Sequence, residues 1–230
     1  MMKTLKESLL SDIEDTLVKG DDDVVRQHIL DQLHDKKLYS YFSMAKDSDA
    51  FIIKKKGNKW IVDVKVNLTC HGTKEGYVTD GTFSFGACGQ NFIIMSDYND
   101  KCGVKSLKYG PTLVNGTYCI MDCPKLKNLR YCPQKIMGDS TISYSGITTL
   151  KYFPEYIKFV EIIGLDKLKT FDICPTTLKE GIRLQRNGFE SDADTVFKSK
   201  VRFLSSQTTC ILLDKPINSF DYETIMGKHT

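Results

Sequence analysis

The chain lacks the features that mark a secreted, membrane-spanning or strongly nucleic-acid-binding protein. Its 230 residues contain no apolar run near the ~20 residues that a membrane span needs, and no apolar segment typical of a secretion signal occurs at the start. The formal net charge of +3 is too small to imply a nucleic-acid partner on its own. With 41% hydrophobic and 27% charged residues, the composition is ordinary for a folded domain. We therefore expect a soluble, unexported protein with a substantial core.

Recognisable catalytic and metal-binding motifs are also missing. The four histidines are scattered without a His-x-x-x-His spacing, and no Cys-x-x-Cys, nucleophile elbow or phosphate-binding glycine loop occurs. Cys70 and His71 could suggest a nucleophile and its base, but adjacent residues on a strand point to opposite faces. These absences predict a protein without enzymatic activity, without catalytic residues, and without a metal or cofactor.

The eight cysteines do not predict a disulfide framework. A chain of this length can bury a core without covalent staples, and disulfides are rare in proteins that are not exported. We expect reduced thiols that act as small buried hydrophobic side chains. The acidic run at 190–194 could bind a divalent cation, but a solvated loop is the simpler interpretation.

The N-terminal region has helical periodicity. Apolar residues four apart predict a helix over residues 5–17, which Gly20 ends. The aspartate run at 21–23 then provides an N-cap and an acidic first turn for a second helix. The apolar positions of that second helix are Val25, Ile29 and Leu33. Residues 1–40 are therefore interpreted as a helical hairpin leader.

The next region has the two-residue period of strands. Apolar residues alternate with polar ones from Trp60 to Leu68, and Gly57-Asn58 supplies the tight turn of a β-hairpin with the apolar run at 51–53. Further short strands are expected near 81–85 and 92–95. Residues 41–100 are interpreted as a β cap for the array that follows, because an open stack needs its end covered.

The strongest pattern is a repeat that appears when the chain is aligned on its prolines. Pro111, Pro133, Pro154 and Pro175 recur with a period of about 21 residues, which lies in the range of solenoid repeats. Two apolar residues precede each proline in fixed register, the second of them four positions earlier. These pairs are Val104 and Leu107, Leu126 and Leu129, Ile147 and Leu150, and Leu168 and Phe171. A turn and a short alternating run follow each proline, so each unit is expected to contain one strand.

A unit of about 21 residues cannot bury its apolar side alone, so neighbouring units must stack. The sequence therefore predicts a β-rich solenoid of about four repeats over residues 101–190, with a parallel sheet on one face. Residues 191–230 are expected to form a C-terminal cap and tail. Cys132 and Cys174 occupy equivalent positions in successive units, which makes them ladder members rather than a metal-binding pair.

These units resemble the degenerate leucine-rich repeats of the form Leu-x-x-Leu-x-x-Cys-Pro, which are common in large proteins of tailed bacteriophages and in some bacteria. Residues 126–133 fit that form best, and residues 168–175 fit it with phenylalanine as the second apolar residue. The resemblance covers about 85 of the 230 residues, from 104 to 188. It implies binding without catalysis, a bacteriophage origin, and a location in the host cytoplasm or in the virion.

The third unit departs from the pattern. Phe159 stands where a glycine is expected after the proline, and the apolar residues at 160, 162 and 163 leave the strand register ambiguous by one position. A slip of one residue would exchange the buried and exposed faces. Because burying an unpaired carboxylate costs several kcal/mol, we expect Glu161 to face solvent.

The expected binding surface is the solvent side of the repeat strands. A solenoid sheet presents rows of outward side chains about 4.8 Å apart. Tyr118, Ile142 and Leu184 are assigned to the core by their alternation. The candidate protein-binding residues are Thr117, Cys119, Met121, Asp139, Thr141, Ser143, Glu161, Arg183 and Gln185. An ordinary hydrated sheet face is the alternative interpretation.

Together these features predict a non-enzymatic protein-binding repeat protein. Its partner would be a phage structural protein or a host or defence protein, and its role that of a virion component or of an inhibitor. The acidic N-terminal hairpin would be a second docking element. Neither the identity of the partner nor the oligomeric state follows from the sequence.

A rival hypothesis is a nucleic-acid-binding protein that uses the basic first repeats. Residues 101–135 contain seven basic side chains against Asp122 alone. Tyrosines could stack bases beside these cations, as in single-strand binders, although Tyr118 is expected to point inward. The residues involved would be Tyr109, Tyr118 and Tyr131 with Lys105, Lys125, Lys127 and Arg130. An enzyme without a recognisable motif is a further alternative.

Overall fold

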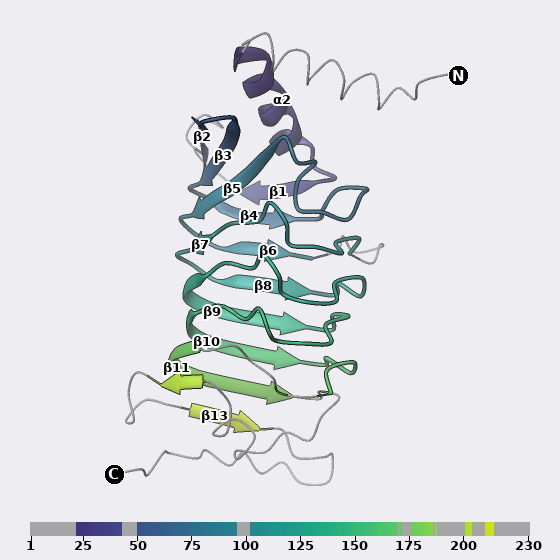
Figure 1. The fold of residues 1–230 in the computed structure, drawn as a ribbon, viewed down its shortest axis with the longest axis vertical. Coiled ribbons are helices and arrows are strands. Elements are labelled where there is room, and N and C mark those ends of the chain that lie inside the picture. The colour runs from purple at the N-terminus through teal and green to yellow at the C-terminus, as the bar shows by residue number, and fades with distance from the viewer. Residues whose placement is uncertain are drawn as a thin grey trace, which may run out of the picture.

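The computed structural model describes residues 22–42, 50–95, 102–169, 171, 176–185, 187, 201–203 and 210–213. They form a β-solenoid of about five turns with one short helix at the N-terminal end (Figure 1). The elements are α2 (Asp22–His34), β1 (Tyr39–Phe42), β2 (Phe51–Lys56), β3 (Lys59–Val64), β4 (Asn67–Cys70), β5 (Phe83–Cys88), β6 (Phe92–Ile94), β7 (Leu113–Val114), β8 (Tyr118–Met121), β9 (Lys135–Ser143), β10 (Tyr156–Ile163), β11 (Thr176–Gln185), β12 (Val201–Phe203) and β13 (Cys210–Leu213). The predicted β-rich solenoid is confirmed.

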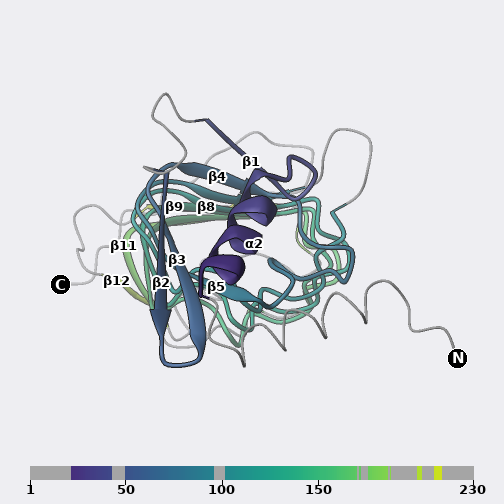
Figure 2. The same ribbon diagram turned by 90° about the horizontal axis from the view of Figure 1, so that it is seen from above.

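The parallel sheet lines two adjacent sides of the solenoid rather than one. The first side, here called the broad sheet, contains β4, β6, β8 and the C-terminal halves of β9, β10 and β11. The second side contains β3, β5, β7 and the N-terminal halves of the same three long strands. Figure 2 shows the sheet curling around this corner. The expectation of a single strand-lined face was therefore too narrow.

Two glycines explain how the coils pass the corner so closely. A Cβ atom on Gly138 would lie 2.5 Å from the carbonyl oxygen of Gly116 in the preceding coil, and one on Gly116 would lie 2.6 Å from the backbone of Gln90. Such distances exclude any side chain at either position. The glycine after the proline is thus required for backbone contact between coils rather than for an unusual dihedral angle.

The inward residues of the sheet form the core as the alternation predicts. Tyr118, Ile142 and Leu184 are at most 2% exposed. In the third unit Val160 and Ile162 are fully buried, which places Glu161 on the outer face. The ambiguous register is resolved in the direction expected from the cost of burying a carboxylate.

The apolar pairs before the prolines form the core beneath the third side, here called the loop side (residues 71–82, 102–112, 122–134, 144–155 and 164–169). Leu107, Leu129 and Leu150 are at most 1% exposed, and Phe171 is 8% exposed. The carbonyl of each of the three leucines accepts a hydrogen bond from the amide three residues later. Adjacent turns are in register, because Asn128 and Thr149 form a parallel bridge.

The proline period corresponds to one coil. The residues after Pro133 and Pro154 bond to their counterparts in the preceding coil: the amide of Gln134 donates to the Thr112 carbonyl at 3.0 Å, and that of Glu155 donates to the Gln134 carbonyl at 2.9 Å. In the next coil the amide of Thr177, one residue further along, donates to the Glu155 carbonyl at 2.8 Å. At Pro133 and Pro154 the ladder resumes with the next residue, because proline itself has no amide hydrogen to donate.

The N-terminal end of the stack is covered by α2, which lies across the opening of the coils (Figure 2). Val25, Ile29 and Leu33 are at most 2% exposed, so the second predicted helix and its apolar face are confirmed. The helix predicted over 5–17 lies outside the described residues. Within the described ranges, no helix is long and apolar enough to cross a bilayer.

The predicted hairpin is present as β2 and β3, which pair antiparallel around Gly57 and Asn58. The alternating run from Trp60 to Leu68 is, however, two strands, because the chain turns the corner between β3 and β4. These strands pair in parallel with β5 and β6, so the solenoid ladder already begins there.

The ladder also extends beyond the last predicted repeat. Both β12 and β13 continue it by pairing in parallel with β11. These two strands lie in the region expected to be a C-terminal cap, and they belong to the sheet itself. Cys174, the acidic run at 190–194 and the tail at 214–230 lie outside the described residues.

Candidate functional site

The outer face of the broad sheet brings several of the predicted binding residues into one row. Thr141 lies beside Cys119 on one side and beside Glu161 on the other, and Glu161 lies beside Arg183. A second row two residues further along the strands contains Met121, Ser143, Ile163 and Gln185. Thr117 immediately precedes β8, and Asp139 is exposed at the corner of β9.

Two of the predicted binding residues are not available to solvent. Cys119 is 9% exposed and Ser143 is 6% exposed, although both were expected on the solvent side. Cys119 alternates with the inward residues of β8, but its short side chain is covered by longer neighbours and interacts with Thr141 in the next coil. Strand alternation predicts the direction in which a side chain points. It does not predict the exposed fraction, which also depends on how far the neighbouring side chains reach.

The charges on the broad sheet are neutralised by one another. Arg183 Nη1 lies 2.7 Å from Glu161 Oε1, and the Thr141 hydroxyl lies 3.5 Å from Glu161 Oε2. At the corner, Lys158 Nζ lies 3.3 Å from Asp139 Oδ1. Every charged residue predicted for this face therefore has an oppositely charged neighbour in an adjacent coil.

Tyr144, which no sequence motif singles out, borders the broad sheet where β9 ends. It is 54% exposed and has a positive φ of 47°. Asp122 and Gly164, the corresponding residues of the neighbouring coils, also have positive φ, of 53° and 63°. The Tyr144 ring lies over Gly164, where a Cβ atom would meet it at 2.6 Å. A half-exposed aromatic ring held on a flat surface is typical of an interface anchor.

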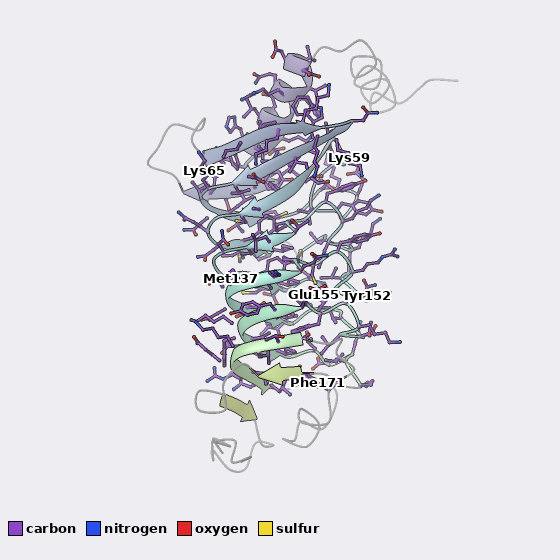
Figure 3. All side chains as sticks on the ribbon, turned by 60° about the vertical axis from the view of Figure 1, so that its left-hand side comes forward. Lys59, Lys65, Met137, Tyr152, Glu155 and Phe171 are labelled. Atoms are coloured by element: carbon purple, nitrogen blue, oxygen red, sulfur yellow. The ribbon has the colours of Figure 1, made fainter. Side chains whose placement is uncertain are left out.

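The loop side carries a second candidate surface, a stripe of tyrosines and cations at equivalent positions of successive coils. Tyr109, Tyr131 and Tyr152 each precede a proline by two residues, and a cation precedes each of these tyrosines. The loop-side stripe is defined as Tyr77, Lys105, Lys108, Tyr109, Lys127, Arg130, Tyr131, Lys151 and Tyr152. Tyr131 and Tyr152 are each 49% exposed, and Tyr152 lies at the margin of the coils in Figure 3.

Two tyrosines of the stripe adopt a backbone conformation that ordinarily belongs to glycine. Tyr109 and Tyr131 both have φ of 70°, each at the third position of a turn closed by the amide of the fourth residue. Positive φ at this position characterises a type II turn, which favours glycine or asparagine. For a bulky side chain such a conformation costs roughly 1–2 kcal/mol. The strain at both sites therefore comes from the tyrosine side chain, because glycine would adopt the same turn without it.

The cations of the stripe lie against its rings. Lys108 Nζ is 4.6 Å from the centre of the Tyr109 ring, and Arg130 Cζ is 5.0 Å from that of Tyr131. Lys105 Nζ is 5.2 Å from the centre of Tyr77, whose ring lies 6.4 Å from that of Tyr109. The stripe is thus continuous from Tyr77 to the Tyr109 coil.

Four cations of the stripe lie away from the carboxylates of the described residues. Within the part of the chain that the structure describes, no ion pair involves Lys105, Lys108, Lys127 or Arg130. A side-chain hydrogen bond with Tyr109 raises the pKa of Lys108, and Coulombic interactions with Tyr131 and Tyr77 act in the same direction. Lys108 therefore stays charged at neutral pH.

Cys70 and His71, the residues considered for catalysis, do not form a nucleophile–base pair. Cys70 is fully buried in the core, and burial raises the pKa of its thiol to about 12, so it is not a nucleophile at neutral pH. His71 Nε2 instead lies 3.1 Å from the Ser40 hydroxyl. In the described ranges, no group of three or more His, Cys, Asp or Glu side chains could hold a metal ion. Among the described residues, six cysteines form no disulfide, and five of them are buried.

Comparison with known proteins adds no assignment. No family model matches the chain, and neither a curated protein nor a solved structure matches it significantly. The resemblance to leucine-rich repeats therefore stays a prediction from the residues themselves.

The sequence contained a usable signal for part of the loop-side stripe. The period of about 21 residues that relates the prolines also relates Tyr109, Tyr131 and Tyr152. Tyr118, which the nucleic-acid hypothesis included, is in the core and cannot take part. Tyr77 has no such signal, because only the stacking of the coils brings it beside Tyr109.

Proposed function

We propose that the protein is a non-catalytic binding protein that presents the broad sheet to a protein partner. The observation that carries this proposal is the mutual neutralisation of Asp139, Glu161 and Arg183 by neighbours on adjacent coils. Desolvating an unpaired charge is costly, whereas a flat surface with satisfied charges can be covered with a smaller penalty. The paired charges therefore lower the cost of covering this face with a protein partner.

The remaining outward residues are compatible with this role. Ile93, Met121 and Ile163 are half-buried and contribute apolar area between the paired charges. Tyr144 provides an aromatic anchor at the margin. Six strands at about 4.8 Å span roughly 24 Å, and four residues of each span roughly 13 Å, so the sheet alone is smaller than a standard interface of ~800 Å² per partner. The partner would therefore also contact a flank, where Tyr144 lies.

The nature of the partner is a finer proposal. The resemblance to phage-type repeats favours a phage structural protein, or a host or defence protein that the chain blocks in the host cytoplasm. The two roles differ in location. Mass spectrometry of purified virions would detect a structural component and would not detect a soluble inhibitor.

The broad sheet offers a matched pair of variants on one strand. Thr141→Arg places a large charged side chain on the broad sheet, and Met137→Arg places the same side chain on the second sheet side, where Met137 is 46% exposed. In an affinity pull-down from the native host, we expect Thr141→Arg to lose a partner that Met137→Arg retains. Tyr144→Asn, which tolerates the positive φ, should weaken the same association.

Circular dichroism and thermal unfolding serve as the control, since both arginine variants should fold as the parent does. If a partner is retained by Thr141→Arg and Tyr144→Asn alike, the broad sheet is not the binding surface. Equal loss with Met137→Arg would likewise contradict the proposal, because the effect would then not be specific to one side.

A further inference from the structure

The loop-side stripe is a second, chemically different surface, and its two exposed rings, Tyr131 and Tyr152, do not contribute to the core. The core beneath it is formed by Leu107, Leu129 and Leu150, which are at most 1% exposed. Tyr131 and Tyr152 lie outside that core at 49% exposure. Glycine or asparagine at Tyr131 would form the same turn without strain. The ring is thus retained at a cost in stability, and its exposed position indicates an external role.

We propose that the loop-side stripe binds single-stranded nucleic acid. This proposal concerns a different face from the broad sheet and does not depend on the protein partner proposed there. The necessary parts are present together. Tyr131 and Tyr152 are exposed, and Tyr77 and Tyr109 are half-buried. The cations that lie against Tyr77, Tyr109 and Tyr131 are not neutralised by a carboxylate of the described residues. Proteins that bind single strands combine a positively charged track along the backbone with aromatic side chains on which bases stack.

The local charge favours an anionic ligand although the whole chain is nearly neutral. Residues 102–152 contain seven basic side chains and two carboxylates, Asp122 and Asp139. Asp139 is paired with Lys158 at the corner of the sheet. The net charge of the coils that carry the stripe is therefore clearly positive, and the overall value of +3 conceals this because acidic residues are concentrated elsewhere.

The tyrosine rings favour a single-stranded nucleic acid over other anionic ligands. An acidic peptide would use the cations but has no planar group that requires a row of tyrosines. A double helix exposes its phosphates while its base faces remain stacked inside. A single strand presents both phosphates and base faces, and base stacking on an aromatic side chain contributes ~1–3 kcal/mol for each base. Sequence specificity is not expected, because every base has a face that can stack.

The backbone holds the cations at a regular interval. The amides of Lys108, Arg130 and Lys151 each donate a hydrogen bond to the polar side chain two residues earlier, at 3.2, 3.0 and 3.3 Å. Successive coils are ~4.8 Å apart, so four ring-bearing coils from Tyr77 to Tyr152 span about 15 Å. This length accommodates a few nucleotides, near the lower end of the ~4–16 known for single-strand binding folds. The affinity should therefore be modest and strongly dependent on salt.

The test uses the full chain and fluorescence anisotropy with a fluorescein-labelled oligothymidine of roughly 12 nucleotides, within the usual range of site sizes. Titrations at several salt concentrations give the slope of affinity against salt. We expect measurable binding at low salt. The double variant Lys108→Gln/Arg130→Gln should reduce that slope by roughly 1.4, since each lost phosphate contact on a single strand contributes ~0.7.

Ring removal tests the aromatic half of the proposal. Tyr109→Asn/Tyr131→Asn keeps residues that tolerate positive φ and should weaken binding about tenfold or more, given the stacking contribution for each base. Tyr152 does not have a positive φ, so Tyr152→Ala gives an independent ring-removal variant should the double variant fold poorly. The charge control is Lys56→Gln/Lys59→Gln, which removes two exposed cations at the hairpin of β2 and β3 and should leave binding unchanged.

Several outcomes would overturn the proposal. These are no binding at low salt, equal loss in the hairpin control, no loss when rings are removed, and competition by a polyglutamate peptide or a DNA duplex as effective as that by the unlabelled single strand. A pattern in which the cation variants weaken binding and the ring variants do not would assign the stripe to an acidic protein instead.

Discussion

The broad sheet and the loop-side stripe differ in how they dispose of charge. On the broad sheet, Glu161 and Arg183 lie on adjacent strands and neutralise each other. On the loop side, Lys108 and Arg130 occupy equivalent positions of successive coils, so like charges recur along the stack with no carboxylate partner among the described residues. A repeat that places the same residue type in every coil accumulates charge, whereas a repeat that varies the residue can balance it. Regularity therefore makes the loop side suited to a regular polyanion.

The largest expected effect tests whether both sides share one core. Leu129→Ala beneath the loop side and Ile142→Ala beneath the broad sheet each delete a side chain that is at most 2% exposed. Each should lower the free energy of unfolding by about 2–5 kcal/mol, as core truncations of this size do. Urea unfolding followed by circular dichroism measures both. A cost below about 1 kcal/mol for Leu129→Ala would show that the loop side is not part of the cooperative core.

The next effect concerns the corner of the sheet, which has no counterpart in the stripe. Gly138→Ala would place a Cβ atom against the Gly116 backbone and should cost about 1–3 kcal/mol through separation of the coils. Gly57→Ala in the hairpin is the control, because no atom lies within 4 Å of a Cβ there and only the strain of its φ of 60° remains. Thermal unfolding should therefore show the lower transition temperature for Gly138→Ala. The reverse order would contradict the close packing at the corner.

A smaller effect on the free energy of unfolding distinguishes two tyrosines of the stripe, because replacement by glycine should relieve strain at one of them and not at the other. Tyr131 has positive φ and Tyr152 does not. Glycine at Tyr131 relieves strain, whereas glycine at Tyr152 only adds conformational freedom to the unfolded chain. We expect Tyr131→Gly to be more stable than Tyr152→Gly by about 1 kcal/mol. Equal free energies of unfolding for the two variants would show that Tyr131 bears no strain, and would remove one argument for an external role of its ring.

The smallest effect is expected for the ion pair on the broad sheet. Glu161 and Arg183 are about a third exposed, so a double-mutant cycle with Glu161→Gln and Arg183→Gln should give a coupling of only about 0.2–1 kcal/mol. The coupling should fall further in 1 M salt, where exposed charges are screened within about 3 Å. A coupling of several kcal/mol would mean that this pair stabilises the fold rather than only neutralising the surface.

The fold followed largely from the spacing of a few residue types. The prolines and the leucine pairs ahead of them predicted the solenoid and its period, and alternation placed Tyr118 and Ile142 in the core. The second sheet side was not predicted. A strand that turns a corner at a glycine shows the same local alternation as two separate strands, so the sequence pattern does not reveal the corner. The antiparallel hairpin was predicted, but its continuation into a coil was not.

The candidate sites were less predictable than the fold. Alternation assigned Cys119 and Ser143 outward, yet both are covered, because burial depends on how far the side chains of adjacent coils extend. Tyr144 carries no motif, and only the strand end and the glycine beneath its ring give it an exposed position at the margin of the broad sheet. The periodic tyrosines of the stripe were visible in the sequence, but their positive φ was not.

By itself the sequence determined that successive units of about 21 residues stack, because none can bury its leucines alone. Only the tertiary structure decided which side chains of different coils are neighbours. Glu161 and Arg183 belong to successive coils and become neighbours through the strand register, while Tyr77 and Tyr109 become neighbours because their backbone segments lie side by side. Pairing across coils depends on distances in space of a few ångströms, which periodicity in the chain does not specify.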